Sequence, residues 1–223
     1  STAELYTNGT QVAQLHLPPT DSPEYPHQIR GGDCNFDIAL FEWGLRTLVE
    51  LALKYRPSDP LLPTWTAARA KLTPGPVDAS TGRMINNATT FDESHRHFSH
   101  LFHLFPLYLV NLNNKTEVDV ATQSLDRWTG LTCSNGDCPN GFTYAGAASQ
   151  SAAIGRSAAA IGNLTRFLTS GKVHRSTMYS EGGSPCIESP LAAASALQDT
   201  LLTSWGHRLR KFVDKHEIAF VKP

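Results

Sequence analysis

Apolar side chains recur three or four positions apart along most of this chain, which is the period of an amphipathic helix. The clearest example is the segment from Asn35 to Tyr55, where Asp33 or Asn35 could cap the start. Similar spacing predicts further helices over residues 63–72, about 94–105, 118–129, 144–160, 164–168 and 190–212. Ser189 is the expected N-cap of the last one, with Pro190 in its first position.

Strands are almost absent from this pattern. Only residues 217–222, Glu-Ile-Ala-Phe-Val-Lys, are predicted to form a short strand, and four prolines preclude a long helix before residue 35. The expected organisation is an irregular segment over 1–34, a helical domain over 35–212 and the start of a β segment over 213–223. The predicted fold class is therefore all-α, with helical hairpins packed in an array or a barrel.

Composition narrows the functional classes. The 223 residues carry a net charge of −1, with 17% charged residues and no basic face. Nucleic acid is therefore not an expected partner. No apolar run reaches the roughly 18 residues that suggest a membrane span.

Secretion is the expected location. Four N-x-Ser/Thr sequons are present, which is more than the one or two expected by chance: Asn8, Asn87, Asn114 and Asn163. Each is a predicted glycosylation site. The chain starts Ser-Thr-Ala-Glu without a signal peptide, so a secreted protein would already have lost its signal.

The four cysteines agree with an oxidising compartment. Cys133 and Cys138 flank an Asn-Gly turn and are predicted to form a disulfide. Cys34 and Cys186 are then left to pair with each other or to remain free. No Cys-x-x-Cys pair indicates a zinc knuckle.

The densest chemistry lies in the segment His95-Arg96-His97-Phe98-Ser99-His100, at a junction between a polar loop and an apolar helix. Such a cluster can hold an anion, a metal or a polyhydroxylated ligand. In a helix, His97, His100 and His103 would share one face and could bind metal. The pattern His-Glu-x-x-His is absent, however, and we predict neither a metal nor a cofactor.

For His100 and His103 the alternative is a core histidine that bonds the backbone. His95, Arg96 and His97 lie where the helix starts, and side chains in that position more often face a cavity. We therefore expect them to contact a ligand.

Two carboxylates are candidate acid–base groups. Glu24 is held between Pro23 and Pro26, and apolar walls there would raise its pKa and suit it to donating a proton. Glu188 precedes the last long helix, whose dipole favours the ionised form. The alternatives are a solvated turn for Glu24 and simple helix capping for Glu188. Serine or cysteine nucleophiles are not indicated, because Gly-x-Ser-x-Gly is absent.

Two separated carboxylates and an Arg/His cluster on a helical array match the needs of glycoside hydrolysis. Four segments carry a family resemblance in the expected order: Leu17-Pro-Pro-Thr-Asp-Ser-Pro-Glu24, Cys34-Asn-Phe-Asp-Ile-Ala-Leu-Phe-Glu-Trp-Gly44, His95-Arg-His-Phe-Ser-His-Leu101, and Cys186-Ile-Glu-Ser-Pro-Leu-Ala-Ala-Ala194 with Leu201-Leu-Thr-Ser-Trp205. They resemble the catalytic domain of glycoside hydrolase family 95, which contains inverting α-L-fucosidases and α-L-galactosidases. The resemblance covers about residues 15–205.

The resemblance implies an (α/α)6 barrel and a role for each matching residue. Glu24 stands at the family's general acid, and Arg96 and His97 at its sugar-binding pair, with His95 and His100 behind them. Glu188 stands where the family has an Asp that, together with asparagines, activates the attacking water.

Two departures from the family pattern matter. Glu188 is one methylene longer than Asp, and Ser189-Pro190 replaces the expected Gly-Asn. The water-activating asparagine segment is not found in this chain, which supplies about half of the twelve helices of a barrel. We therefore expect a companion chain that carries the N-terminal half, and a glycan substrate. The rival hypothesis is a catalytically inactive glycoprotein that uses the barrel for carbohydrate binding or assembly.

Overall fold

The computed structural model describes residues 6–7, 10–11, 14–21, 30–85, 94–132, 139–205 and 208–211. The chain forms two compact units. Unit 1 comprises residues 1–92 and 97–124, and unit 2 comprises residues 93–96 and 125–223.

The predicted all-α class is confirmed. The described residues form six α-helices and one 3-10 turn: α1 Asn35–Tyr55, α2 Leu62–Lys71, η1 Ser99–Leu101, α3 Lys115–Gly130, α4 Gly141–Ala153, α5 Ser157–Thr169 and α6 Glu188–Leu201. Their strands are short and antiparallel, in four pairs: β1 Tyr6–Thr7 with β2 Thr10–Gln11, β3 Thr20–Asp21 with β4 Arg30–Gly31, β5 Tyr179–Glu181 with β6 Ser184–Cys186, and β7 Leu202–Trp205 with β8 Arg208–Lys211. No helix among the described residues has the length and apolarity needed to cross a membrane.

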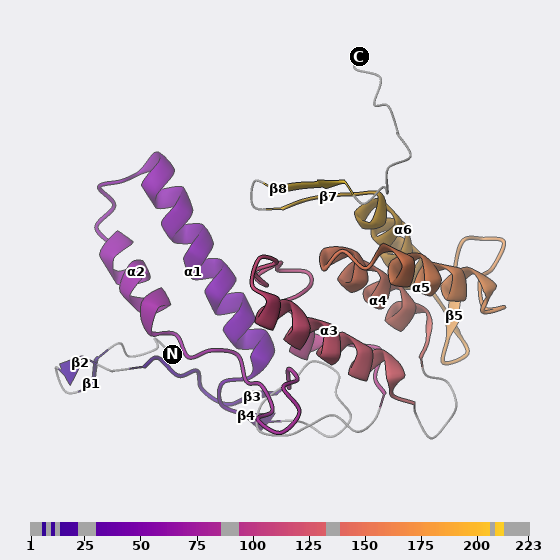
Figure 1. The fold of residues 1–223 in the computed structure, drawn as a ribbon, viewed down its shortest axis with the longest axis horizontal. Coiled ribbons are helices and arrows are strands. Elements are labelled where there is room, and N and C mark those ends of the chain that lie inside the picture. Colours follow the sequence, from indigo (N-terminus) through magenta and orange to yellow (C-terminus); the bar gives the residue numbers. More distant parts are fainter. Residues whose placement is uncertain are drawn as a thin grey trace, which may run out of the picture. The chain divides into compact units, whose positions relative to one another are not determined.

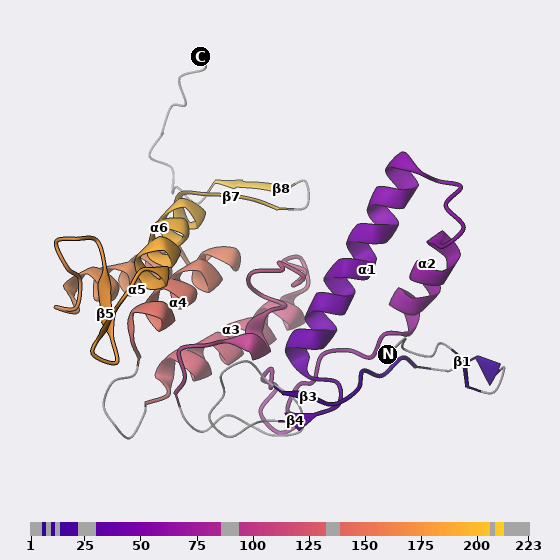
Figure 2. The same ribbon diagram turned by 180° about the vertical axis from the view of Figure 1, so that it is seen from behind.

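In unit 1, α1 and α2 form a helical hairpin (Figures 1 and 2). The predicted bounds of α1 are confirmed, and those of α2 differ by one residue at each end. The predicted cap is wrong, because the N-cap residue is Cys34 and no side chain bonds the helix start. Asp33 instead accepts a hydrogen bond of 2.7 Å from the Leu17 backbone N–H, while Asn35 points into the interior of the unit.

The helix predicted over residues 94–105 is replaced by the single turn η1 and a series of tight turns. The backbone at its start is bonded elsewhere, because the Ser94 N–H donates to the Thr132 carbonyl at 3.2 Å and the His95 carbonyl accepts from Trp128 Nε1 at 2.9 Å. A helix would use the His95 carbonyl to bind the Ser99 N–H, and Pro106 only prevents the segment from continuing as a helix. Consequently His97, His100 and His103 do not share a helix face.

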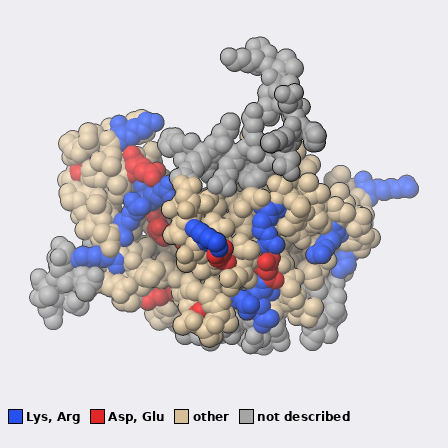
Figure 3. Space-filling model, in the orientation of Figure 1, with Lys and Arg blue, Asp and Glu red and all other residues tan. Residues whose placement is uncertain are grey.

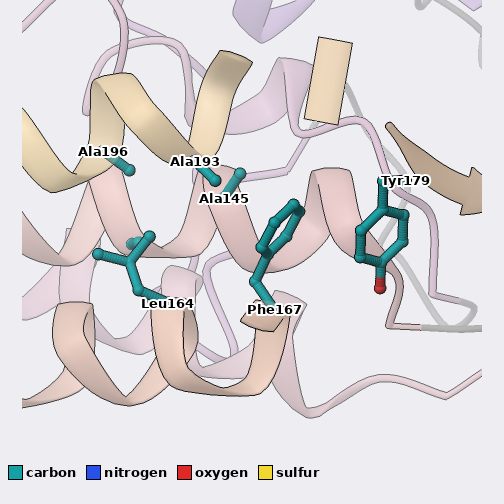
Figure 4. Close-up of a cluster of buried hydrophobic side chains, with 7 residues drawn as sticks. Ala145, Leu164, Phe167, Tyr179, Ala193 and Ala196 are labelled. Atoms are coloured by element: carbon teal, nitrogen blue, oxygen red, sulfur yellow. The ribbon is translucent and has the colours of Figure 1, made fainter. Parts of the chain in front are cut away.

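Unit 2 is built on α4, which packs against both α5 and α6 (Figure 1). Its core combines small and aromatic side chains: Ala145, Ala148, Leu164, Phe167, Tyr179, Ala193 and Ala196 (Figure 4). The small alanines on α4 and α6 allow these helices to pack closely. The predicted boundary is wrong, because Gly155 adopts φ 79° and divides the segment into α4 and α5.

The last helix is also shorter than predicted. It ends at Leu201, and Leu202 turns to an extended conformation (φ −152°, ψ 120°) that starts β7. Pairing of β7 with β8 then supplies the backbone hydrogen bonds that a helix through residue 212 would have made. The strand predicted over 217–222 lies outside the described residues.

Candidate functional site

Arg96, which lies between His95 and His97 in the sequence motif, forms an ion pair within unit 2. Its Nη1 lies 3.2 Å from Oε2 of Glu181. The Glu181 side chain is 4% exposed and that of Arg96 is 34% exposed. The carboxylate is therefore an interior anchor, from which the guanidinium extends to the solvent.

Glu181 binds two further donors through Oε1. The backbone N–H of Phe142, in the first turn of α4, donates at 2.8 Å, and the hydroxyl of the fully buried Ser189, in the first turn of α6, donates to the same oxygen. A guanidinium and a backbone N–H can only donate, so Glu181 binds them as a carboxylate. This one side chain connects Arg96 to the N-terminal turns of two helices, where the helix dipoles favour a negative charge.

Local sequence explains how Glu181 reaches this position. It ends β5, and Gly182 and Gly183, with φ of 53° and 80°, form the two-residue turn that leads into β6. A turn with positive φ at both central residues matches the twist of a hairpin and strongly prefers glycine. The pair Gly-Gly directly after an acidic residue was a signal that sequence reasoning missed.

Strand β5 is held against the helices by an aromatic contact. The Tyr179 ring stacks on Phe167, with centroids 4.7 Å apart and an interplanar angle of 26°; Figure 4 shows both rings beside the alanine contacts of the core. A Cβ on Gly141 would come within 2.6 Å of the Tyr179 ring. Glycine at the start of α4 is thus what allows β5 to lie this close.

Glu188 is exposed at the first position of α6. The predicted cap is corrected here, since the N-cap is Ile187 and Ser189 lies inside the helix. The pKa of Glu188 is held below its ordinary value, first by a hydrogen bond from its own backbone N–H, and further by the Cys186 thiol, the Ile187 N–H and the charge of Arg96. An ionised Glu188 agrees with the role expected of it, and Arg96 lies within electrostatic reach of it.

Cys186 extends this network at its other end. Its Sγ donates to the Ser189 hydroxyl at 3.3 Å, and Ser189 donates in turn to Glu181. The network therefore runs from Cys186 through Ser189 and Glu181 to Arg96.

The three histidines of the motif occupy different environments. His95 is half-buried and its carbonyl accepts a hydrogen bond of 2.9 Å from Trp128 Nε1, and His97 is half-buried as well. His100 is only 3% exposed, and burial lowers its pKa to about 3. His100 is therefore a neutral imidazole, which agrees with the core-histidine alternative.

A second buried polar centre lies in unit 1, around Asn35. Its Nδ2 donates to the carbonyls of Pro76 (3.1 Å) and Ile85 (3.0 Å), which turns Oδ1 toward His103 Nδ1 at 2.8 Å. Nδ1 of His103 must then carry a proton and donate. Gly75 is required beside this pair, because a Cβ there would lie 2.7 Å from His103 Cε1.

Glu42 lies at the rim of this centre. Its Oε2 is 3.5 Å from His103 Nε2. The hydrogen bond with His103 is the main cause of a lowered pKa at Glu42, assisted by the charges of His103, Arg69 and Arg46. Sequence reasoning treated His103 as a metal ligand or a core residue, and did not find this contact.

The remaining predicted site residues are distributed as follows. Five lie outside the described residues: Glu24, Cys133, Cys138, Asn8 and Asn87. Cys34 and Cys186 are free thiols in the structure. Cys34 is buried and donates instead to the Gly31 carbonyl at 3.1 Å.

The two described sequons differ in setting. Asn114 is exposed just before α3, where its Nδ2 donates to Glu117 Oε1 at 2.8 Å. Asn163 is half-buried within α5. Both remain predictions as glycosylation sites, and the exposed loop position of Asn114 is the more accessible of the two.

The described residues also bear on whether the chain has a metal site or a surface patch of one charge. No group of three or more His, Cys, Asp or Glu side chains within the described ranges could hold a metal ion. On the face in Figure 3, Lys and Arg lie interspersed with Asp and Glu.

Comparison with known families places the chain in a class. Residues 4–196 match the glycosyl hydrolase family 95 catalytic domain. This match covers most of the chain, so the protein belongs to glycosyl hydrolase family 95, and its class is that of the glycoside hydrolases. The resemblance drawn from the motifs is thereby confirmed, and a glycan is the implied substrate. A search of curated proteins found no match.

Proposed function

We propose that this protein cleaves terminal α-L-fucosyl or α-L-galactosyl residues with inversion of configuration. The observation that carries the proposal is the arrangement around Arg96. Its guanidinium is anchored by the buried Glu181, partly exposed, and close enough to Glu188 to help keep that carboxylate ionised. A cation beside an ionised carboxylate can hold sugar hydroxyls while the carboxylate orients water.

Inversion requires an acid on one side of the glycosidic bond and a base on the other, separated by about 6.5–9.5 Å. In the proposed mechanism Glu24 protonates the leaving oxygen and Glu188 activates or orients the attacking water. Arg96 and His97 hold the sugar hydroxyls. His95 and His100 support that pair from behind.

A companion chain carrying the N-terminal half of the barrel belongs to this proposal, because it would supply the asparagines that assist Glu188. Its support is the apolar exposure of α1, where seven large apolar side chains are 42% to 65% exposed: Leu40, Phe41, Trp43, Leu48, Leu51, Leu53 and Tyr55. Soluble monomers rarely expose so much apolar surface on one element. We also propose that the assembled protein is secreted and glycosylated.

The activity is tested with intact native material on α-L-fucosyl and α-L-galactosyl oligosaccharides, with NMR detection of the released sugar. Initial release of the β-anomer, abolished by Glu24→Gln, is the expected result. Asp21→Asn is the matched control, since it neutralises an exposed carboxylate nearby and should leave the rate unchanged. Initial release of the α-anomer would overturn inversion.

The same experiment decides the rival function. Glu188-Ser-Pro in place of the family's Asp-Gly-Asn favours an inactive barrel that only binds carbohydrate. That function predicts no hydrolysis, together with saturable calorimetric binding of an α-L-fucosyl oligosaccharide that Arg96→Ala abolishes. For the companion chain, a monodisperse and stable monomer of this chain alone in light scattering would contradict the proposal.

A further inference from the structure

We propose that Glu181 is a positioning residue, which sets Arg96 for the sugar and, through Ser189, sets the turn of α6 that bears Glu188. This inference rests on the proposed function and adds a residue that the family motifs do not include. Its basis is that one buried carboxylate bonds both the guanidinium and the helix start.

Glu181 restrains the side chain of Arg96. An arginine side chain has several rotatable bonds, and ordering it on a ligand costs conformational entropy unless it is already held. The Nη1 bond to a carboxylate that is itself 4% exposed holds the guanidinium before any sugar arrives. At 34% exposure, Arg96 remains accessible to a ligand.

Glu181 also restrains the turn of α6 that bears Glu188. Ser189 follows it directly, is fully buried and donates to Glu181 Oε1, while the Phe142 N–H binds the same oxygen. The position of the Glu188 backbone relative to Arg96 is thus set through one side chain. Catalytic groups tolerate displacements of only about 0.5 Å, and a shared anchor is a direct way to meet that limit.

Replacing the Glu181 carboxylate with an amide separates the positioning of Arg96 from the capping of α4 and α6. A neutral amide oxygen can accept from Phe142 and Ser189 as a carboxylate does, but it cannot pair with the charge of Arg96. Glu181→Gln therefore keeps an acceptor for both neutral donors and weakens the bond to Arg96.

The test compares Glu181→Gln with Asp199→Asn in the intact protein. Asp199 is a carboxylate near the other end of α6 that accepts from Ser149 Oγ at 3.1 Å. We expect Glu181→Gln to raise KM for an α-L-fucosyl oligosaccharide about tenfold, which is about 1.4 kcal/mol, and Asp199→Asn to leave KM within about twofold. In an Arg96→Gln background, Glu181→Gln should add almost nothing to KM. An equal increase in both backgrounds would mean a purely structural role and overturn the proposal.

A spectroscopic readout keeps the inference independent of activity. In 15N NMR, a guanidinium held by a carboxylate shows separate Nη resonances, and we expect these for Arg96 in the wild type and their collapse in Glu181→Gln. One averaged Arg96 signal in the wild type would overturn the proposal even if the enzyme is active. Separate signals in a wild type without hydrolysis or binding would support the positioning and reject the proposed function.

Ser189→Ala provides a second variant that does not depend on the folding of Glu181→Gln. It removes only the link to α6, so kcat should fall with KM within about twofold. An unchanged kcat in a folded Ser189→Ala protein would contradict the positioning of Glu188 through Ser189.

Discussion

The two units each bury one polar side chain that makes three hydrogen bonds, yet the two centres differ in charge. Asn35 in unit 1 is 1% exposed and bonds two backbone carbonyls and His103. Glu181 in unit 2 is 7% exposed as a whole residue and 4% exposed in its side chain, and it bonds a guanidinium, a backbone N–H and a hydroxyl. The first centre is built on a neutral amide, with the Glu42–His103 contact at its rim, whereas in the second the central side chain itself forms the ion pair.

This difference separates a structural centre from a candidate functional one. A neutral amide joins loops at a modest desolvation cost, whereas a buried ion pair is often no more stabilising than apolar packing of the same volume. A charge retained in the interior therefore calls for a further reason. For Glu181 we infer that the reason is the positioning of Arg96, whose side chain is partly exposed and whose charge lowers the pKa of Glu188.

The largest expected effect comes from removing the charged anchor. Glu181→Ala leaves Arg96, the Phe142 N–H and the Ser189 hydroxyl without their acceptor, and should lower the free energy of unfolding by about 3–5 kcal/mol. Urea denaturation measures this. Glu50→Ala, which breaks only a surface pair with Arg46, should change stability by about 0.5 kcal/mol or less. Comparable losses in the two variants would show that Glu181 does not anchor unit 2.

The neutral centre should respond more weakly. Asn35→Ala strands the carbonyls of Pro76 and Ile85 and should cost about 2–3 kcal/mol in the same assay. The exposed Asn113→Ala is its control. If Asn35→Ala costs more than Glu181→Ala, the contrast between the two centres is wrong.

The pH dependence of the free energy of unfolding tests the buried, neutral His100 in unit 1. Burial lowers the pKa of His100 to about 3 from 6.5, so the unfolded chain takes up a proton in this interval and the folded chain does not. The resulting stability is present above pH 6.5 and is lost as the pH falls, by about 2 kcal/mol between pH 7 and pH 5. His100→Gln should flatten this slope in urea titrations at the two pH values, whereas the exposed His174→Gln should not. An unchanged slope in His100→Gln would exclude this histidine as its origin.

A pair of glycines gives the smallest effects, with opposite signs. Gly75→Ala forces a Cβ against His103 and Asn35 and should destabilise by about 1–2 kcal/mol. Gly44→Ala, in α1 with nothing within 4 Å of the new Cβ, should stabilise by about 0.5–1 kcal/mol. Thermal or urea unfolding of both variants checks the signs. A stabilising Gly75→Ala would mean that the Asn35 centre is loosely packed.

Helix prediction succeeded where one local rule acted alone. The apolar period and flanking prolines predicted α1 and α2 to within a residue. It failed where a tertiary contact or a special backbone conformation overrode the period, as at His95, whose carbonyl is bonded by Trp128, and at Gly155, which adopts positive φ. Beyond Leu201 the competing interaction was a hairpin with β8, which apolar spacing does not reveal.

Site prediction followed the same division. Arg96 was predicted from the motif and Glu188 from its place before the last long helix, and both stay predictions as site residues. Glu181 was missed because it lies 85 positions from Arg96 and reads locally as a turn acid before two glycines.

The sequence by itself determined the family, the helical class and the ionised state expected of Glu188, because motif order, apolar period and helix dipole are properties of neighbouring residues. Only the tertiary structure decided that Glu181 is buried, that it holds Arg96, and that His100 is kept neutral. Burial and ion pairing depend on which distant segments pack around a side chain, and no local pattern in the chain records that.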